Sequence, residues 1–124
     1  MKPAKFASSR AYASRKGLPV FDHVLIPRGK GIHACLQGMS GHMAAVYDVT
    51  IQYDGGVPGT IQFFTVGGYT ARLHAVRYDV ALVPERERDL NQWLLDVFTS
   101  KNKIMATGLK EMEAIRTFSV SSQI

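Results

Sequence analysis

Two cations that alternate with glycines form the most suggestive chemical pattern in the chain. Arg28 and Lys30 are followed by Gly29 and Gly31 respectively, and Pro27 ends a short apolar run directly before them. Glycines let the backbone approach a ligand closely, and the N-terminus of a following helix carries partial positive charge. The segment therefore predicts an oxyanion or phosphate site formed by Arg28, Lys30 and Gly31. A solvated turn with two surface cations is the alternative interpretation.

A histidine and an aspartate lie five residues apart at His74 and Asp79. Such a pair could serve as a general base and the carboxylate that orients it. The surrounding residues read as a β-strand, however, in which positions five apart face opposite sides and are too distant to pair. We therefore interpret this spacing as a coincidence and predict no catalytic residue in the chain.

Other reaction centres that have recognisable motifs are missing from the sequence. It contains no nucleophile elbow, no phosphate-binding P-loop and no paired cysteines, and its four histidines are not spaced as metal ligands. We therefore expect neither a metal site nor a cofactor. The single cysteine, Cys35, excludes an internal disulfide, and we interpret it as a small buried apolar residue.

The elements that must position these residues follow from the periodicity of the apolar side chains. Residues 3–16 predict a helix with so little apolar content that it lies on a surface. Apolar residues recur at helical spacing within 31–39 and again within 90–105, which predicts a short and a longer helix. Strands are predicted for residues 45–54, 60–66 and 71–80, with a short extended piece at 24–26.

The order of these elements predicts the α/β class, as a partial layer in which a small mixed sheet is flanked by helices. A helix between segments 24–26 and 45–54 would permit a right-handed parallel crossover. Residues 1–107 would form one portion of a domain, and residues 108–124 a polar tail. Because a sheet of three or four strands covered on one side is marginal alone, the chain reads as part of a larger domain.

Composition and charge narrow the possible partners. The 124 residues are 46% hydrophobic and 20% charged, as in one small globular domain, which predicts a folded chain and not wholesale disorder. No apolar run is long enough to cross a bilayer. Residues 1–30 hold seven basic side chains against one acid, a balance of +6, whereas the whole chain has a net charge of +5. This positive field favours a phosphate, an anionic membrane surface or a nucleic acid.

Two central blocks resemble a known enzyme family. Residues 23–38 (HVLIPRGKGIHACLQG) and 45–55 (AVYDVTIQYDG) are similar to the segment after the E-G-T-R motif in 1-acylglycerol-3-phosphate acyltransferases, particularly the branch typified by plant microsomal enzymes. The similarity continues through Leu73-His74 and the predicted helix around 93–98 with Lys101. It covers about residues 3–105 and is most specific in the two blocks.

The resemblance implies a membrane-bound enzyme of phospholipid biosynthesis. Such an enzyme transfers an acyl group from acyl-CoA or an acyl carrier protein to lysophosphatidic acid, giving phosphatidic acid. The turn at 28–31 would lie near the phosphate-bearing acceptor, and residues 45–50 would help to line the acyl-donor region. The family's catalytic H-x-x-x-x-D and its E-G-T-R motif should both lie before Met1. We therefore expect the C-terminal portion of an acyltransferase domain, inactive by itself and attached to the membrane through the missing N-terminal part.

Two other hypotheses stay open. The charge of residues 1–30 could mark a small basic module that binds nucleic acid or anionic lipid. Few aromatic side chains (Phe6, Tyr12 and Phe21) accompany the basic residues and no nucleic-acid motif occurs, so we expect no nucleic-acid partner. Alternatively, the chain could be a stand-alone subunit that completes an acyltransferase core in trans.

Overall fold

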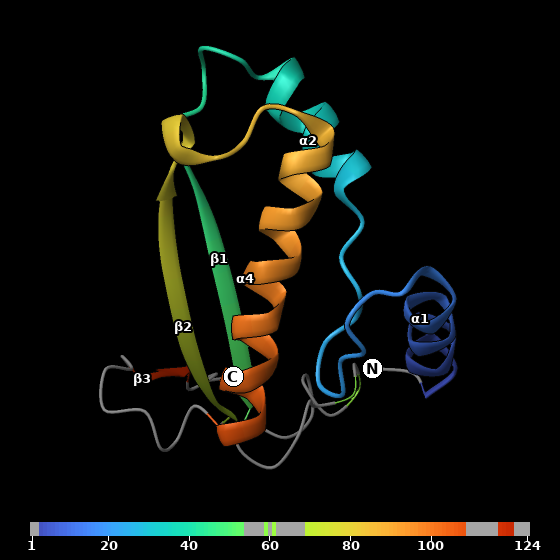
Figure 1. The fold of residues 1–124 in the computed structure, drawn as a ribbon. Coiled ribbons are helices and arrows are strands. Elements are labelled where there is room, and N and C mark those ends of the chain that lie inside the picture. The colour runs from blue at the N-terminus through green and yellow to red at the C-terminus, as the bar shows by residue number, and fades with distance from the viewer. Residues whose placement is uncertain (1–2, 54–58, 60, 62–68, 109–116, 121–124) are drawn as a thin grey trace. The chain divides into compact units, whose positions relative to one another are not determined.

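The computed structural model describes residues 3–53, 59, 61, 69–108 and 117–120 of the chain. The elements in chain order are α1 (Pro3–Lys16), α2 (Gly29–Gly38), β1 (Ala45–Tyr53), β2 (Tyr69–Asp79), the 3-10 turn η1 (Val80–Leu82), α4 (Glu87–Thr107) and β3 (Thr117–Val120) (Figure 1). They divide into two compact units. The first comprises residues 1–46 and 77–106, and the second comprises residues 47–76 and 107–124.

Helix α1 ends at a glycine, as predicted. Gly17 has a φ of 64°, a left-handed conformation that glycine adopts without steric cost. The N–H of Leu18 donates to the carbonyl oxygen of Ala13 at 2.9 Å, which satisfies one of the last carbonyls of the helix. Ala13 is also the one buried residue of α1, so the prediction of a surface helix is confirmed.

The segment after α1 differs from its prediction. Residues 18–28 form neither helix nor strand, so the extended piece at 24–26 is not a strand and the predicted parallel crossover is wrong. Val24 and Ile26 are instead buried as part of a loop that lies in the core. The backbone N–H of Ile26 donates to Ser9 Oγ of α1 at 2.9 Å, and this bond replaces the ladder partner that a strand would supply.

The first unit contains two clusters of buried apolar side chains. The first core cluster consists of Ala13, Phe21, Val24 and Ile26, with Tyr12, Leu18, Leu95, Phe98 and Met105 packed around it. The second core cluster consists of Val83, Leu90 and Leu94, with Ile32, Leu36, Val46, Tyr78 and Trp93 packed around it. Helix α4 supplies side chains to both clusters, which its apolar residues at helical spacing predicted.

Helix α2 begins at Gly29, two residues before its predicted start. Gly29 is buried, and a Cβ atom at this position would overlap Asn91 Oδ1 and lie 3.5 Å from Leu94 Cδ1. The missing side chain therefore lets the first turn of α2 approach α4 closely. Ile32 and Leu36, about one and two turns further on, pack against the second core cluster.

The prediction that Cys35 is buried is wrong, because its side chain is exposed. In a helix, residues four apart lie on one face, and Ile32 and Leu36 occupy the face toward the second core cluster. Cys35 is rotated by about 100° from Leu36, which carries it out of that contact. Met39, the last residue of the predicted apolar pattern, lies after the end of α2 and is 45% exposed.

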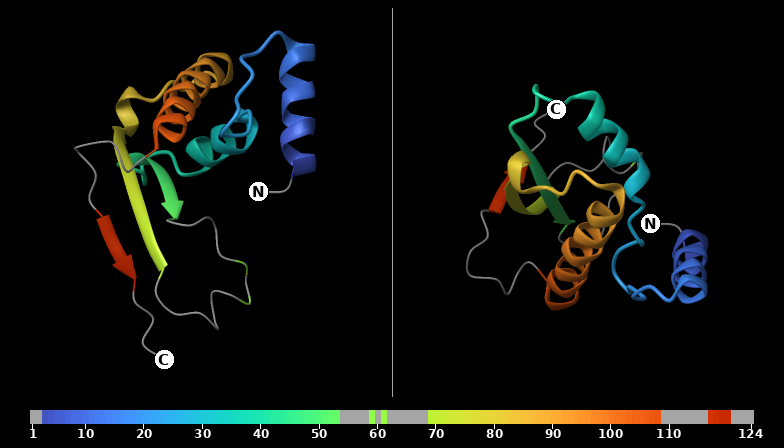
Figure 2. Two further views of the ribbon diagram at one scale, coloured as in Figure 1. Left: turned by 90° about the horizontal axis from the view of Figure 1, so that it is seen from below. Right: turned by 45° about the horizontal axis from the view of Figure 1, so that its top comes forward.

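The described strands form one sheet in the order β1-β2-β3. Strands β1 and β2 run in opposite directions (Figure 1). Figure 2 shows β3 beside the first part of β2, where the antiparallel register runs from Tyr69 opposite Val120 to Arg72 opposite Thr117. The α/β class is therefore confirmed, whereas the described strands make an antiparallel sheet rather than a mixed one. The predicted strand at 60–66 lies outside the described residues, apart from Ile61.

Three large apolar side chains of β1 lie on the more exposed face of the strand. Tyr47, Val49 and Ile51 point to one face and are 61%, 42% and 47% exposed. On the opposite face, Thr50 is only 4% exposed. The more apolar face of this strand is thus the more exposed one.

Candidate functional site

A groove of about 390 Å³ lies in the first unit, against the first turn of α2. Segments that are far apart in the sequence form its walls, namely α1 and the loop that follows it, the start of α2, and α4. The residues that line it are Tyr12, Leu18, Pro27, Arg28, Gly29, Lys30, Glu87, Asn91 and Leu95.

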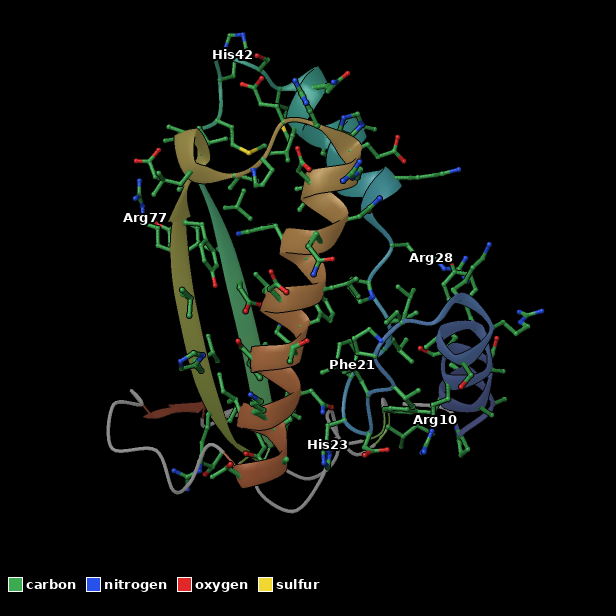
Figure 3. All side chains as sticks on the ribbon, in the orientation of Figure 1. Arg10, Phe21, His23, Arg28, His42 and Arg77 are labelled. Carbon is green, nitrogen blue, oxygen red and sulfur yellow. The ribbon has the colours of Figure 1, made fainter. Side chains whose placement is uncertain are left out.

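Arg28 lies at the N-cap position of α2, with extended backbone angles of −120° and 113°. Its side chain makes no capping hydrogen bond. The guanidinium carbon instead lies 5.1 Å from the centre of the Tyr12 ring, a cation–π distance, and Figure 3 shows Arg28 on the side of α2 that is near α1. Tyr12 thus holds the cation at the edge of the groove while leaving the side chain exposed.

Lys30 lies in the first turn of α2 and lines the groove with an exposed side chain. That turn contains no acidic residue, so the partial positive charge of the helix N-terminus adds to the charges of Lys30 and Arg28. The first N–H groups of a helix have no partner within it and can donate to an anion. This end of α2 therefore combines two cations with backbone donors.

The two glycines of the predicted site have different surroundings. Gly31 does not line the groove, and a Cβ atom there would meet nothing within 4 Å. Gly29, which was not among the predicted site residues, lines the groove and makes the close approach to α4. The structure thus places Arg28 and Lys30 together on the groove, whereas Gly31 faces open space.

The groove is also lined by polar groups that sequence reasoning missed. Glu87 and Asn91 come from the first turns of α4, and Tyr12 comes from α1. Glu87 brings a carboxylate and Asn91 an amide, groups that accept or donate hydrogen bonds to a ligand hydroxyl. No motif in the sequence joined these residues to Arg28, because only the packing of the three helices brings them to one groove.

The His74 and Asp79 pair does not form a catalytic dyad. Both residues lie on β2, and five residues along a strand correspond to about 16 Å. The Asp79 carboxylate accepts a hydrogen bond from the N–H of Ala81 at 3.0 Å and lies 4.0 Å from the Arg77 guanidinium. Asp79 therefore caps η1 and has its own cationic neighbour.

The described residues contain neither a metal cluster nor a membrane-spanning helix. Within them, no group of three or more His, Cys, Asp or Glu side chains could hold a metal ion. None of the helices in the same described part of the chain has the length and apolar character needed to cross a membrane.

Comparison with known proteins shows similarity to one set of enzymes. The chain is 35% identical over 103 residues to probable 1-acyl-sn-glycerol-3-phosphate acyltransferase 5 of Arabidopsis thaliana, which covers 82% of this chain and 28% of the plant protein. It is 32% identical over 108 residues to 1-acyl-sn-glycerol-3-phosphate acyltransferase epsilon of Mus musculus, covering 80% of this chain and 30% of the mouse protein. With the gamma enzyme of Homo sapiens it shares 32% identity over 101 residues, or 81% of this chain and 27% of the human protein.

The chain thus spans less than a third of the length of these curated relatives. No protein-family model matches the chain. No solved structure matches it either. The similarity to the curated enzymes nevertheless extends over 80–82% of this chain. Over the residues that these relatives match, the chain belongs to the 1-acyl-sn-glycerol-3-phosphate acyltransferase family.

Proposed function

We propose that this chain supplies part of the acceptor-binding surface of an enzyme that acylates lysophosphatidic acid. The acyl donor is acyl-CoA or an acyl carrier protein, and the product is phosphatidic acid. One observation carries the proposal: Arg28 and Lys30 lie together on a groove at the N-terminus of α2. The names of the relatives support the choice of acceptor, because each of them contains 1-acyl-sn-glycerol-3-phosphate.

The chemistry of the groove suits a phosphate monoester that carries a neighbouring hydroxyl. A phosphate monoester is nearly dianionic at neutral pH. The planar fork of Arg28 can bind two of its oxygens, Lys30 contributes a point charge, and the first N–H groups of α2 donate to the remainder. Glu87 and Asn91, which also line the groove, would then bond to the glycerol backbone.

Acyl transfer joins the free acceptor hydroxyl to the acyl carbon as the thioester carbon–sulfur bond breaks. A general base must take the hydroxyl proton, and the thiol of the donor finally receives it. His74 is too far from Asp79 to act with it, so we assign no such base to this chain. The purified chain, mixed with acyl-CoA and lysophosphatidic acid, should release no CoA above background. Turnover that is abolished by His74→Ala would contradict this prediction.

Titration calorimetry with sn-glycerol 3-phosphate, a soluble probe of the acceptor head group, tests the groove. Arg28→Ala and Lys30→Ala should each weaken binding by about tenfold, because each removes a charge-assisted contact of roughly 1.4 kcal/mol. Lys103→Ala is the matched control, since Lys103 is an exposed cation of α4 that does not line the groove. Equal weakening in all three variants would mean that overall charge, and not the groove, determines the affinity. Unchanged affinity in Arg28→Ala and Lys30→Ala would contradict the proposed site.

We also propose that the whole protein works at a membrane. Its proposed acceptor is an amphiphile whose acyl chain partitions into bilayers, so enzyme and acceptor meet at a lipid surface.

A further inference from the structure

Among the residues of the sheet that the structure describes, two buried polar atoms lack a hydrogen-bond partner. They are Thr50 Oγ1 of β1 and His74 Nδ1 of β2, and Thr50 as a residue is only 4% exposed. Nearly all buried polar atoms in native proteins are hydrogen-bonded, to protein or to ordered water. Two unpartnered atoms in one sheet therefore point to a ligand that they share, provided that they are neighbours.

The strand pairing makes them neighbours. The N–H of Val80 donates to the carbonyl oxygen of Ala44 at 3.0 Å, directly before β1 and directly after β2. Continuing this antiparallel register by two residues sets Val46 opposite Tyr78, and both pack against the second core cluster, as residues on one sheet face should. A further four residues along each strand set Thr50 opposite His74, on that same face.

The separation of such a pair suits a single bridging group. Residues directly opposite each other in an antiparallel pair have Cβ atoms about 4.5–5.5 Å apart. The hydroxyl and the ring nitrogen make no direct bond. Side chains at this Cβ spacing leave room for one small group between their polar atoms. A hydroxyl donates or accepts, and so does an imidazole nitrogen, according to its tautomer. A group that can both donate and accept hydrogen bonds therefore suits either tautomer of His74 and either role of the Thr50 hydroxyl. A water molecule is the smallest such group.

We propose that Thr50 and His74 bind one internal water molecule, which links β1 to β2 through their side chains. The water accepts from or donates to Thr50 Oγ1 and bonds to His74 Nδ1. This gives His74 a structural role in the sheet and accounts for an imidazole that the proposed acyl transfer does not use. Neither Thr50 nor His74 lines the groove of Arg28 and Lys30, so the proposal does not depend on the proposed function.

Water–protein NMR on the unmodified, isotope-labelled chain tests the site directly. A water held between the two strands resides long enough to give negative nuclear Overhauser cross-peaks, and these should appear at the side-chain protons of both Thr50 and His74. Thr50→Ser keeps the hydroxyl and should keep the cross-peak at His74, whereas Thr50→Val should lose it. Absence of slow water at both residues of the unmodified chain would overturn the proposal.

A double-mutant cycle by urea unfolding provides a second, independent measurement. Thr50→Val and His74→Phe each remove one partner of the bridge, so their effects on the unfolding equilibrium constant should be coupled by about fivefold or more. Thr70→Val is the matched control. Thr70 lies on the same face of β2 as His74 but four residues away along the strand, too far to share the water. The effects of Thr70→Val and His74→Phe on the unfolding equilibrium constant should therefore be additive. Additive effects for Thr50 and His74 would contradict a shared water. Displacement of the slow-water signal by sn-glycerol 3-phosphate would instead assign the pair to a ligand and also overturn the proposal.

Discussion

At the scale of single residues, Leu90 has the clearest energetic role. Its side chain is 0% exposed and belongs to the second core cluster. Leu90→Ala removes three heavy atoms there and leaves a cavity, so it should lower the free energy of unfolding by about 2–5 kcal/mol. Urea unfolding followed by the fluorescence of Trp93, which packs against the same cluster, measures this loss.

Leu82 provides the matched control for Leu90. Its side chain is 78% exposed in η1, so Leu82→Ala should change the free energy of unfolding by no more than about 0.5 kcal/mol. A similar loss in both variants would mean that Leu82 is buried by something that the described residues do not include, and that η1 is not a free surface.

The same scale shows what sequence reasoning could find in the candidate site. Arg28 and Lys30 were predictable because they are two residues apart, so one local segment carries both to the groove. Tyr12, Glu87 and Asn91 were not predictable, because each joins the groove only through helix packing across long stretches of chain. A local sequence pattern shows which charged residues share a turn. It does not show which side chains from distant helices lie together, because these meet only when the core packs.

At the scale of elements, Gly29 is where the first turn of α2 meets α4. Gly29→Ala would place a Cβ against Asn91 Oδ1, so the Asn91 side chain must turn away, and the unfolding free energy should fall by about 1 kcal/mol. Asn91 lines the groove, so the affinity for sn-glycerol 3-phosphate should change as well. Urea unfolding and calorimetry on the same variant measure both effects.

Gly31→Ala is the control for this prediction. A Cβ at Gly31 meets nothing within 4 Å, and alanine favours helix over glycine by about 0.5–1 kcal/mol. This variant should therefore be as stable as the original chain or slightly more stable. If both substitutions destabilise equally, the cost arises from helix conformation at these positions and not from the approach to α4.

The bounds of the long elements, which regular apolar spacing or turn residues mark, were predictable to within a few residues. The short elements were not predictable. Helices α1 and α4 and strands β1 and β2 match their predicted ranges within a few residues, because amphipathic periodicity and turn residues mark them. The apolar run at 24–26 was misread because a buried loop and a buried strand show the same composition. Strand β3 was missed within the predicted polar tail, because four residues carry too little pattern and its pairing with β2 is a long-range backbone contact.

At the scale of the whole molecule, the uneven charge has a measurable effect. The cations of α1 include Lys5, Arg15 and Lys16, all exposed, and the helix contains no acid. The chain should therefore bind a heparin column, and salt should elute it by screening. Replacing these three cations with alanine should lower the eluting salt concentration markedly, with the fold unchanged by circular dichroism.

This measurement also separates the acyltransferase proposal from the hypothesis of a basic binding module. The three α1 cations do not line the groove, so their loss should leave binding of sn-glycerol 3-phosphate nearly unchanged. If the same variant also loses binding of sn-glycerol 3-phosphate, one diffuse positive field accounts for the binding of both heparin and sn-glycerol 3-phosphate. That outcome would support the basic binding module and contradict the proposed groove site.

The exposed thiol of Cys35 makes α2 directly accessible to spectroscopy. It is the only cysteine of the chain, so a maleimide dye or a nitroxide spin label attaches at one position without any engineering. That position lies on the same helix as Lys30, little more than one turn further along. A label there would report changes in emission or spin mobility when the first turn of α2 engages an anion, on the native sequence and in real time.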